Sequence, residues 1–342
     1  MKRRGFGPLE LVLLLYFASY LPNIILTRLA TATPRAELGR PLTGLETLPS
    51  TLIMNMVLTY LFIWLSGWHR DAHGRQLGPV RVPVPTRYTF LSGIGTALVL
   101  CTVPLSFTLT DVSIPFIQLL MRGDILIIAP LVDLMFGRRV RWWSWSALVL
   151  VAAALVLVVR QRGGFHLSPL AIATVVLYTL GYFLRLAVMT RVAKRGDADL
   201  VRQYFVEEKV IALPMSIVAL AALSLAGLGL QAGELGFGFL KVWTDPVIWP
   251  LAGVAVTLTI VSVFAAIILL DPHENSYCVP LERSTSLVAG LAASYILHWG
   301  WSMPRPTGTE MLGSTLLIFA IVLLTVAPRL QKPQPPIHTA AP

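Results

Sequence analysis

Stretches of about 20 apolar residues recur along the whole chain, with only short polar segments between them. Crossing the roughly 30 Å hydrocarbon core of a bilayer takes about 20 such residues in a helix. Ten segments meet this requirement, at residues 9–29, 48–68, 90–109, 112–136, 142–159, 167–189, 205–228, 247–270, 276–299 and 308–326. Charged residues make up 13% of the chain, against about 25% in soluble domains. The sequence therefore predicts an integral, multi-pass membrane protein without a soluble domain.

The apolar stretches lack the two-residue alternation of barrel strands, so the spans are expected to be helices that satisfy their own backbone hydrogen bonds. The predicted fold is an all-α polytopic membrane protein with ten transmembrane helices. Lys and Arg concentrate in short cytoplasmic loops. With the N-terminus inside, the inside segments hold sixteen of the 27 basic residues and the outside loops six. Both termini are therefore expected to be cytoplasmic, at the inner membrane if the cell is bacterial.

Ten helices divide into two groups of five, at residues 1–163 and 164–328, and residues 329–342 are expected to be a disordered tail. When the two halves are aligned so that Tyr16 lies on Tyr178, three more polar landmarks coincide to within one position: Tyr20 with Tyr182, Asn23 with Arg185, and Arg122 with Arg283. Because each half has an odd number of spans, the two copies must insert in opposite orientations. This is the inverted repeat of many secondary transporters.

Charged residues lie deep inside two of the predicted spans. Arg122 and Asp124 fall in the fourth span, and Glu282 and Arg283 fall in the ninth. Charges near the bilayer centre are costly, so they are expected to face a polar interior. Neighbouring residues on a helix do not face each other, so each Arg is expected to pair elsewhere. Two interpretations stay open: at least one Arg binds substrate, or the charges form a structural ion-pair set that includes Asp133.

A second group of charges, Glu207, Glu208 and Lys209, opens the seventh predicted span. These residues either bind substrate or are interfacial charges at a helix start, where the helix dipole favours Glu. Arg185, near the inner end of the sixth span, is expected to reach the interface. The four tyrosines of the repeat either line a cavity or pack in the core: Tyr16, Tyr20, Tyr178 and Tyr182.

Features of other protein classes are weak in this sequence. The net charge of +10 is spread over several short loops, which does not favour nucleic-acid binding. His69 and His73 have the spacing of a metal-binding helix but lack the Glu base of a zinc protease. A metal or catalytic cluster has only one compact candidate, an acidic turn formed by Asp271, His273 and Glu274. The segment 227–238 is Gly-rich and predicts a flexible outer connection. No catalytic residue, metal or cofactor is therefore assigned.

The ten-helix pattern, with polar landmarks in the fourth, seventh and ninth spans, resembles the drug/metabolite transporter superfamily, which includes EamA-like proteins. Within it the chain is similar to the nucleotide-sugar and triose-phosphate carriers. Their ninth-helix signature, Gly-Ala-Leu-Asn-Lys followed by Ala-Gly-Leu, is matched at Leu281, Arg283 (for Lys), Ala289, Gly290 and Leu291. The chain departs from it at Val279, Pro280 and Glu282.

Two further positions carry the resemblance. Counting back from Pro214, Glu208 and Lys209 stand where the seventh helix of these carriers has two Asn residues. Arg122 is similar to a basic residue in the fourth helix of phosphate-sugar carriers.

These features predict a secondary carrier that works by alternating access, without nucleotide hydrolysis. Small residues at 93–95 and 289–290 are expected to permit close helix approach. Deep arginines favour an organic anion such as a phosphorylated sugar or nucleotide sugar. Acidic neighbours leave open the export of amino acids or other zwitterionic or neutral metabolites. A membrane-embedded transferase and a scaffold subunit are the alternatives from other classes. The expected partners are the small-molecule substrate, membrane lipids and, as a possibility, a second copy in a homodimer.

Overall fold

A computed structural model describes the chain except for residues 1–8, 35–38, 78–79, 110–115, 118, 122–127, 129–130, 132–133, 136–141, 162–167, 193–196, 228, 272–274 and 331–342. The fourth predicted span, 112–136, falls largely on these positions, and its described residues are helical. Arg122, Asp124, Asp133, His273 and Glu274 lie outside the described residues, as does most of the predicted tail.

Helices form nearly all of the described structure, and each apolar stretch outside 112–136 lies in one. The long helices are α1 (Leu9–Ala32), α2 (Gly44–Leu65), α3 (Arg87–Thr108), α5 (Trp142–Gln161), α6 (Pro169–Val192), α7 (Ala198–Leu225), α9 (Ile248–Leu269), α10 (Asn275–Trp301) and α11 (Gly308–Leu330). Among the described residues, six of these helices are long and apolar enough to cross a membrane: α1, α2, α3, α6, α7 and α9. The prediction of an integral membrane protein built of helices is confirmed at this level.

Capping side chains set where several helices begin. At α2 the Thr43 hydroxyl accepts from the Glu46 amide, and the Glu46 carboxylate accepts from the Thr43 amide. Thr86 and Thr89 make the same reciprocal arrangement at α3. These capping boxes satisfy amides that have no partner within the helix. Asp197 caps α7, which therefore begins well before the predicted apolar span at Phe205.

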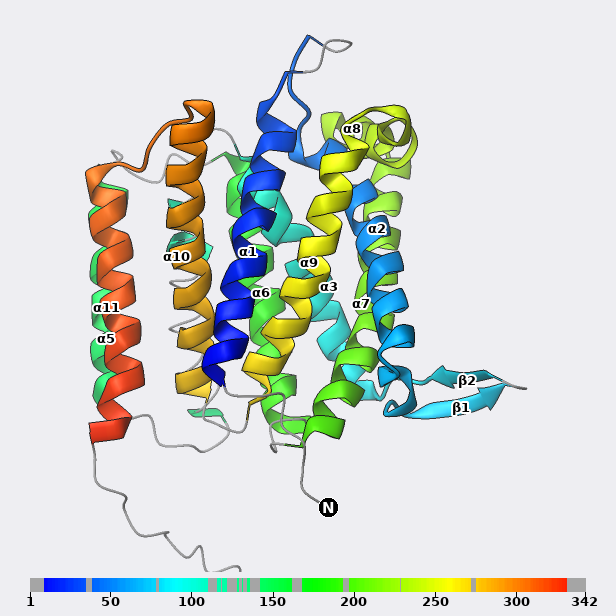
Figure 1. Ribbon diagram of the computed structural model, residues 1–342, viewed down its shortest axis with the longest axis horizontal. Helices are drawn as coiled ribbons and strands as arrows, with labels where there is room; N and C mark the ends of the chain where they lie inside the picture. The colour runs from blue at the N-terminus through cyan, green and yellow to red at the C-terminus, as the bar shows by residue number, and fades with distance from the viewer. Residues whose placement is uncertain are drawn as a thin grey trace, which may run out of the picture.

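The helices stand side by side in one bundle (Figure 1). Along one side α5 packs on α11, α11 on α10, α10 on α1, α1 on α9, and α9 on α2. Behind them α3 packs against both α6 and α7. Buried side chains fill the spaces between these helices in several hydrophobic clusters rather than in one.

Helix α3 approaches both neighbours closely because it carries glycine at the contacts. A Cβ atom on Gly95 would lie 2.5 Å from the carbonyl oxygen of Gly181 on α6, and one on Gly93 would lie 2.6 Å from Cβ of Ile211 on α7. Such distances leave no room for a side chain. The predicted close approach at residues 93–95 is confirmed.

Two short elements differ from the sequence prediction. The segment expected to be a flexible connection is the helix α8 (Gly229–Leu240), which packs on α2 and α7. Its Gly238 lies against the Glu46 carbonyl and Pro49, which explains the glycine content by close approach rather than by flexibility. The loop between α2 and α3 contains a 3-10 turn, Trp68–Arg70, and an antiparallel hairpin of β1 (Gly74–Leu77) and β2 (Val80–Pro83). The hairpin projects from the end of the bundle opposite α8 (Figure 1).

Candidate functional site

Charged side chains are buried in the interior of the bundle. Glu207 and Glu208 are fully buried, Lys209 is 2% exposed, and Arg185, Glu282 and Arg283 are each below 7% exposed. Removing a charge from water costs several kcal/mol unless partners replace the lost hydration. The partners of each residue therefore indicate whether it is a structural element or a binding group.

Arg185 on α6 and Glu208 on α7 form the most completely satisfied pair. Arg185 Nε donates to Glu208 Oε1 at 2.9 Å, and Nη2 donates to Oε2 at 3.2 Å. Ser92 and Thr96 on α3 also donate to Oε1, at 2.9 and 2.7 Å. Tyr204, one turn before Glu208, donates to the same oxygen at 3.1 Å. Every oxygen of this carboxylate is used, so the pair joins three helices.

This arrangement corrects two predictions. Glu208 is not an interfacial charge at a helix start, because α7 begins at Ala198 and places Glu208 about 15 Å along the helix axis. Arg185 does not reach the interface, since its side chain is buried and bound to Glu208. The predicted apolar span begins at residue 205, after the helix has begun, because the first two turns of α7 carry polar residues. These turns nevertheless pack against other helices.

Among the buried cations that the structure describes, Lys209 has the fewest partners. Its ammonium lies 5.5 Å from the centre of the Phe205 ring on the same helix. Within the described part of the chain it makes no hydrogen bond and no ion pair closer than 4.0 Å. Glu208, its neighbour in sequence, is already occupied by Arg185 and three hydroxyls. Lys209 therefore brings a positive charge into the interior that no described side chain pairs with directly.

Glu282 and Arg283 on α10 form the second charged centre, together with aromatic rings of α1 and α6. Arg283 Nε lies 2.8 Å from Glu282 Oε2. The guanidinium carbon is 4.1 Å from the ring centre of Tyr182 and 5.7 Å from that of Tyr178. The Tyr16 hydroxyl donates to the other carboxylate oxygen of Glu282. A guanidinium over an aromatic face gains cation–π attraction that strengthens away from water.

The expectation that each Arg pairs away from its neighbour is wrong for Arg283. The two side chains leave α10 about 100° apart, but the flexible Arg stem bends back until Nε meets the carboxylate. The contact is an ion pair without good hydrogen-bond alignment, because neither atom has a partner of ordinary geometry within the described structure. The Tyr182 hydroxyl is buried beside them in the same condition. This centre is less completely satisfied than the Arg185–Glu208 pair.

The four tyrosines of the repeat are buried and stack in pairs. Tyr16 and Tyr20 have ring centres 5.3 Å apart, and Tyr178 and Tyr182 have ring centres 5.9 Å apart. All four belong to hydrophobic clusters, and three of them also contact Glu282 or Arg283. The same tyrosine rings therefore pack in the core and contact the charged centre.

Glu207 connects α7 to the hairpin loop at one end of the bundle. Its Oε1 accepts from the His73 backbone amide at 3.1 Å and lies 2.8 Å from His73 Nδ1. Its Oε2 accepts from Thr89 at the start of α3, at 2.9 Å. Five residues earlier on α7, Arg202 Nε donates to Asp71 Oδ2 at 2.5 Å. These contacts fix the loop before the hairpin onto α7.

Sequence reasoning missed four residues that complete these clusters: Ser92, Thr96, Tyr204 and Gln203. It named His73 for its spacing from His69 and missed its contact with Glu207. Ser92 and Thr96 are one turn apart, and so are Tyr204 and Glu208. That spacing marks polar stripes on α3 and α7 and was available in the sequence. No group of three or more His, Cys, Asp or Glu residues placed to hold a metal occurs among the described residues.

Comparisons with known proteins show a similar fold and do not indicate a function. No protein-family model matches the sequence, and no curated protein matches it. Among solved structures, 26 chains match. One of them, described only as "Crystal structure of protein", has a TM-score of 0.55 and 17% sequence identity over 95% of this chain and 99% of that chain. The fold is therefore similar to a solved one over nearly its whole length.

Proposed function

We propose that this protein is a secondary transporter of a small organic anion. The observation that carries the proposal is Lys209, a cation buried between helices with no hydrogen bond or ion pair to any described residue. An unpaired buried charge is strongly unfavourable in a purely structural role. An anionic cargo that enters the bundle supplies the missing partner.

Arg283 supports the same cargo. Its guanidinium meets the Glu282 carboxylate through Nε and lies over the Tyr182 face. Guanidinium groups bind carboxylate and phosphate through paired N–H contacts. Among the described residues, the two charged centres together with Lys209 hold three cations, Arg185, Lys209 and Arg283, against two anions, Glu208 and Glu282. A phosphorylated sugar, a nucleotide sugar or another carboxylated or phosphorylated metabolite fits this balance.

The transporter architecture proposed here has ten transmembrane helices in two inverted repeats, as in the drug/metabolite transporter superfamily. Under this repeat, α1, α2 and α3 correspond to α6, α7 and α9. Two packing arrangements then become equivalent: α3 on α6 matches α9 on α1, and α3 on α7 matches α9 on α2. Related helices that exchange partners in this way support a pseudo-twofold axis through the bundle.

Polar contacts follow the same relation. Asn55 Nδ2 on α2 donates to Thr259 on α9 at 2.8 Å. The alignment that superposes Tyr16 on Tyr178 relates these two residues, to within one position, to Ser216 on α7 and Ala97 on α3. There the Ser216 hydroxyl reaches the carbonyl oxygen of Ala97 at 3.4 Å. The stacked tyrosine pairs of α1 and α6 are equivalent in this alignment as well. Alternating access by rocking of the two halves is the mechanism that such a repeat favours.

Two alternatives make different demands. Export of amino acids or other zwitterions is favoured by the buried carboxylates of Glu208 and Glu282, although both already have cationic partners. A membrane-embedded transferase needs a catalytic acid or metal cluster near one face, and Asp271 is the described member of the only candidate turn. Transport uses the buried cations and not this turn, so alanine at Asp271 separates the two classes.

The decisive experiment is a thermal-shift screen of the purified protein against sugar phosphates, nucleotide sugars, nucleotides and amino acids. A ligand at about 100 times its Kd stabilises the folded state by about 2.7 kcal/mol. We expect an anion to raise the melting temperature, and Arg283→Gln and Lys209→Gln to remove that shift. Arg191→Gln is the matched control, because Arg191 stacks on Tyr88 at 5.0 Å but is exposed. Shifts by amino acids alone, or shifts that survive both variants, contradict the anion proposal.

Topology is tested separately. Ten spans place both termini on the same side of the membrane, and the distribution of Lys and Arg in the loops favours the cytoplasmic side. Cysteine-accessibility labelling or reporter fusions at residues 2 and 342 then give the same side, and labelling at Lys241 gives the opposite side. Termini on opposite faces contradict the ten-helix arrangement whatever the cargo is.

A further inference from the structure

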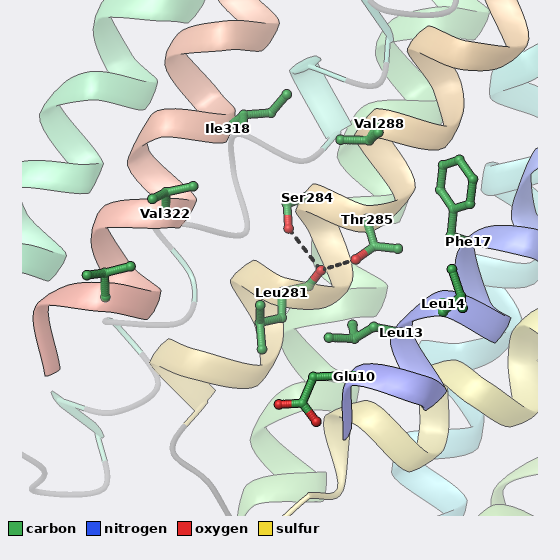
Figure 2. Close-up of a pocket in the computed structure, with 11 residues that line it drawn as sticks. Glu10, Leu13, Leu14, Phe17, Leu281, Ser284, Thr285, Val288, Ile318 and Val322 are labelled. Atoms are coloured by element: carbon green, nitrogen blue, oxygen red, sulfur yellow. Dashed lines mark hydrogen bonds between the residues drawn. The ribbon is translucent and has the colours of Figure 1, made fainter. Parts of the chain in front are cut away.

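A groove of about 500 Å³ runs along the outer side of α1, α10 and α11. Its walls are the apolar side chains of Leu13, Leu14 and Phe17 on α1, Leu281 and Val288 on α10, and Ile318, Val322 and Val326 on α11. In Figure 2 those of these side chains that are labelled face a common space between the three helices. Leu14 is 63% exposed and Val322 is 48% exposed, so the groove opens sideways from the bundle.

The polar groups of the groove are unevenly distributed. Ser284 and Thr285 donate to the carbonyl oxygen of Leu281, at 3.0 and 2.8 Å, so both hydroxyl protons are used within α10. Glu10 lies at one end of the groove (Figure 2). Its carboxylate makes no hydrogen bond and no ion pair with a described residue. The groove is therefore apolar along its length and carries one available negative charge at its end.

Along the helix axes the groove covers most of the thickness of one membrane leaflet. From Glu10 to Phe17 the rise along α1 is about 10 Å, and from Ile318 to Val326 along α11 it is about 12 Å. Half of the roughly 30 Å hydrocarbon core is about 15 Å. Glu10 is in the first turn of α1, and Val326 is in the last turns of α11. The acidic end therefore lies at the end of the bundle, where lipid head groups meet water.

We propose that the groove binds one phospholipid whose head group carries a primary ammonium, with an acyl chain along α10 and the ammonium at Glu10. The apolar walls match a hydrocarbon chain, and the Glu10 carboxylate accepts charge-assisted hydrogen bonds from an ammonium N–H. A quaternary ammonium has no N–H to donate, and an anionic head group is repelled. The lipid is thereby distinguished from the bulk bilayer by its head group. The site lies outside the buried charges assigned to transport.

The same two turns of α10 present Leu281, Ser284, Thr285 and Val288 to the groove and Glu282 and Arg283 to the interior. A lipid in the groove thus packs against the outer side of the segment that carries the charged centre. Occupancy is expected to stabilise this segment, and it does so whether or not the cargo proposal is correct.

The test measures lipid retained by the purified full-length protein after reconstitution in nanodiscs with equal parts of dioleoyl phosphatidylethanolamine, phosphatidylcholine and phosphatidylglycerol. Protein is re-extracted in detergent, and bound lipid is quantified by mass spectrometry. We expect phosphatidylethanolamine to be enriched about tenfold over phosphatidylcholine. Glu10→Gln is expected to remove the enrichment, because it removes the charge that recognises the ammonium.

Leu14→Trp fills the groove and is expected to lower total bound lipid several-fold. Leu11→Trp is its matched control, because Leu11 is an exposed leucine of the same helix that does not line the groove. Ser284→Leu provides a second filled groove if Leu14→Trp does not yield folded protein. Equal retention of the three lipids, or enrichment that persists in Glu10→Gln, overturns the proposal. A dimer that Leu14→Trp dissociates overturns it as well, because a second copy then occupies the groove.

Discussion

Arg185 on α6 holds Glu208 on α7 through two parallel contacts, Nε to Oε1 at 2.9 Å and Nη2 to Oε2 at 3.2 Å. This fork-to-fork geometry fixes both distance and orientation. Ser92 and Thr96 extend the contact to α3. The pair therefore connects three helices. Lys209, the next residue along α7, carries a positive charge that takes no part in this connection.

Glu208→Ala is predicted to lower stability by about 3–5 kcal/mol, because it leaves the Arg185 guanidinium buried without a partner. The measurement is the melting temperature of the purified protein in detergent. The double change Arg185→Met with Glu208→Leu is expected to recover part of the loss, since apolar groups of similar volume replace both charges. Asp199→Ala is the control, because the Asp199 side chain is 71% exposed and an exposed ion pair contributes less than about 1 kcal/mol. A Glu208→Ala melting temperature equal to that of the unaltered protein refutes the prediction.

Lys209→Met is predicted to leave the melting temperature unchanged or to raise it. The reason is that the buried ammonium loses hydration on folding and gains no hydrogen bond from the described residues. The same variant is expected to lose the stabilisation given by an anionic ligand. Lys241→Met, at an exposed position, controls for the removal of a positive charge. A large fall in the melting temperature of Lys209→Met indicates a structural cation instead.

Gly95→Ala is predicted to destabilise the bundle by about 1–3 kcal/mol, as overpacking does. The new Cβ would lie 2.5 Å from the carbonyl oxygen of Gly181, so α3 and α6 must separate. Gly233→Ala on α8 is the matched control, because nothing lies within 4 Å of its Cβ position. That substitution is expected to stabilise α8 by about 0.5–1 kcal/mol. Thermal melts of the two variants should therefore shift in opposite directions.

Glu234→Gln is predicted to raise the melting temperature at neutral pH. Burial of the Glu234 carboxylate on α8 raises its pKa above the ordinary 4.5, and the nearby Glu46 carboxylate raises it further. The folded protein then binds this proton more tightly than the unfolded chain, so stability falls as the pH rises from 4.5 through the folded pKa. Glutamine removes this penalty, and its gain is expected to disappear below about pH 4.5. Melting curves between about pH 4 and pH 8 measure the effect.

Glu46→Gln is the control for that series, and its melting temperature is expected to change in the opposite direction. Glu46 accepts from Arg40 at 2.6 Å and from the Thr43 backbone amide at 2.8 Å, so its replacement removes favourable contacts. It should lower the melting temperature at neutral pH. A gain for both glutamine variants would mean that general charge reduction, and not the raised pKa of Glu234, explains the result.

The long helices were predictable because each needs a mostly apolar surface wherever it lies in the bundle. Such a segment can be recognised from its own residues, without knowledge of its neighbours. The repeat alignment placed Tyr16 and Tyr20 opposite Tyr178 and Tyr182, and the structure shows both pairs stacked and buried. The true start of α7 was also available, because Asp197 is an N-cap residue. A search for apolar stretches alone overlooked it.

The partners of the buried charges were not predictable in the same way. Glu208 meets Ser92 and Thr96 only because glycines let α3 approach α7 closely, and no local pattern states which helices become neighbours. The Glu282–Arg283 contact was missed for a different reason. The rule that side chains three or four residues apart are neighbours describes the surface of a helix. In the buried interior, the long Arg283 side chain bends toward the nearest carboxylate, that of Glu282.

The loop that leads into the hairpin is bound to α7 at two successive turns, by Asp71 with Arg202 and by His73 with Glu207. The hairpin itself projects clear of the bundle (Figure 1). An antibody fragment that binds the two strands would therefore be connected to α7 through this loop. On α7, the buried residues Glu208 and Lys209 directly follow Glu207. Such a binder would give electron microscopy a marker whose orientation follows that of α7.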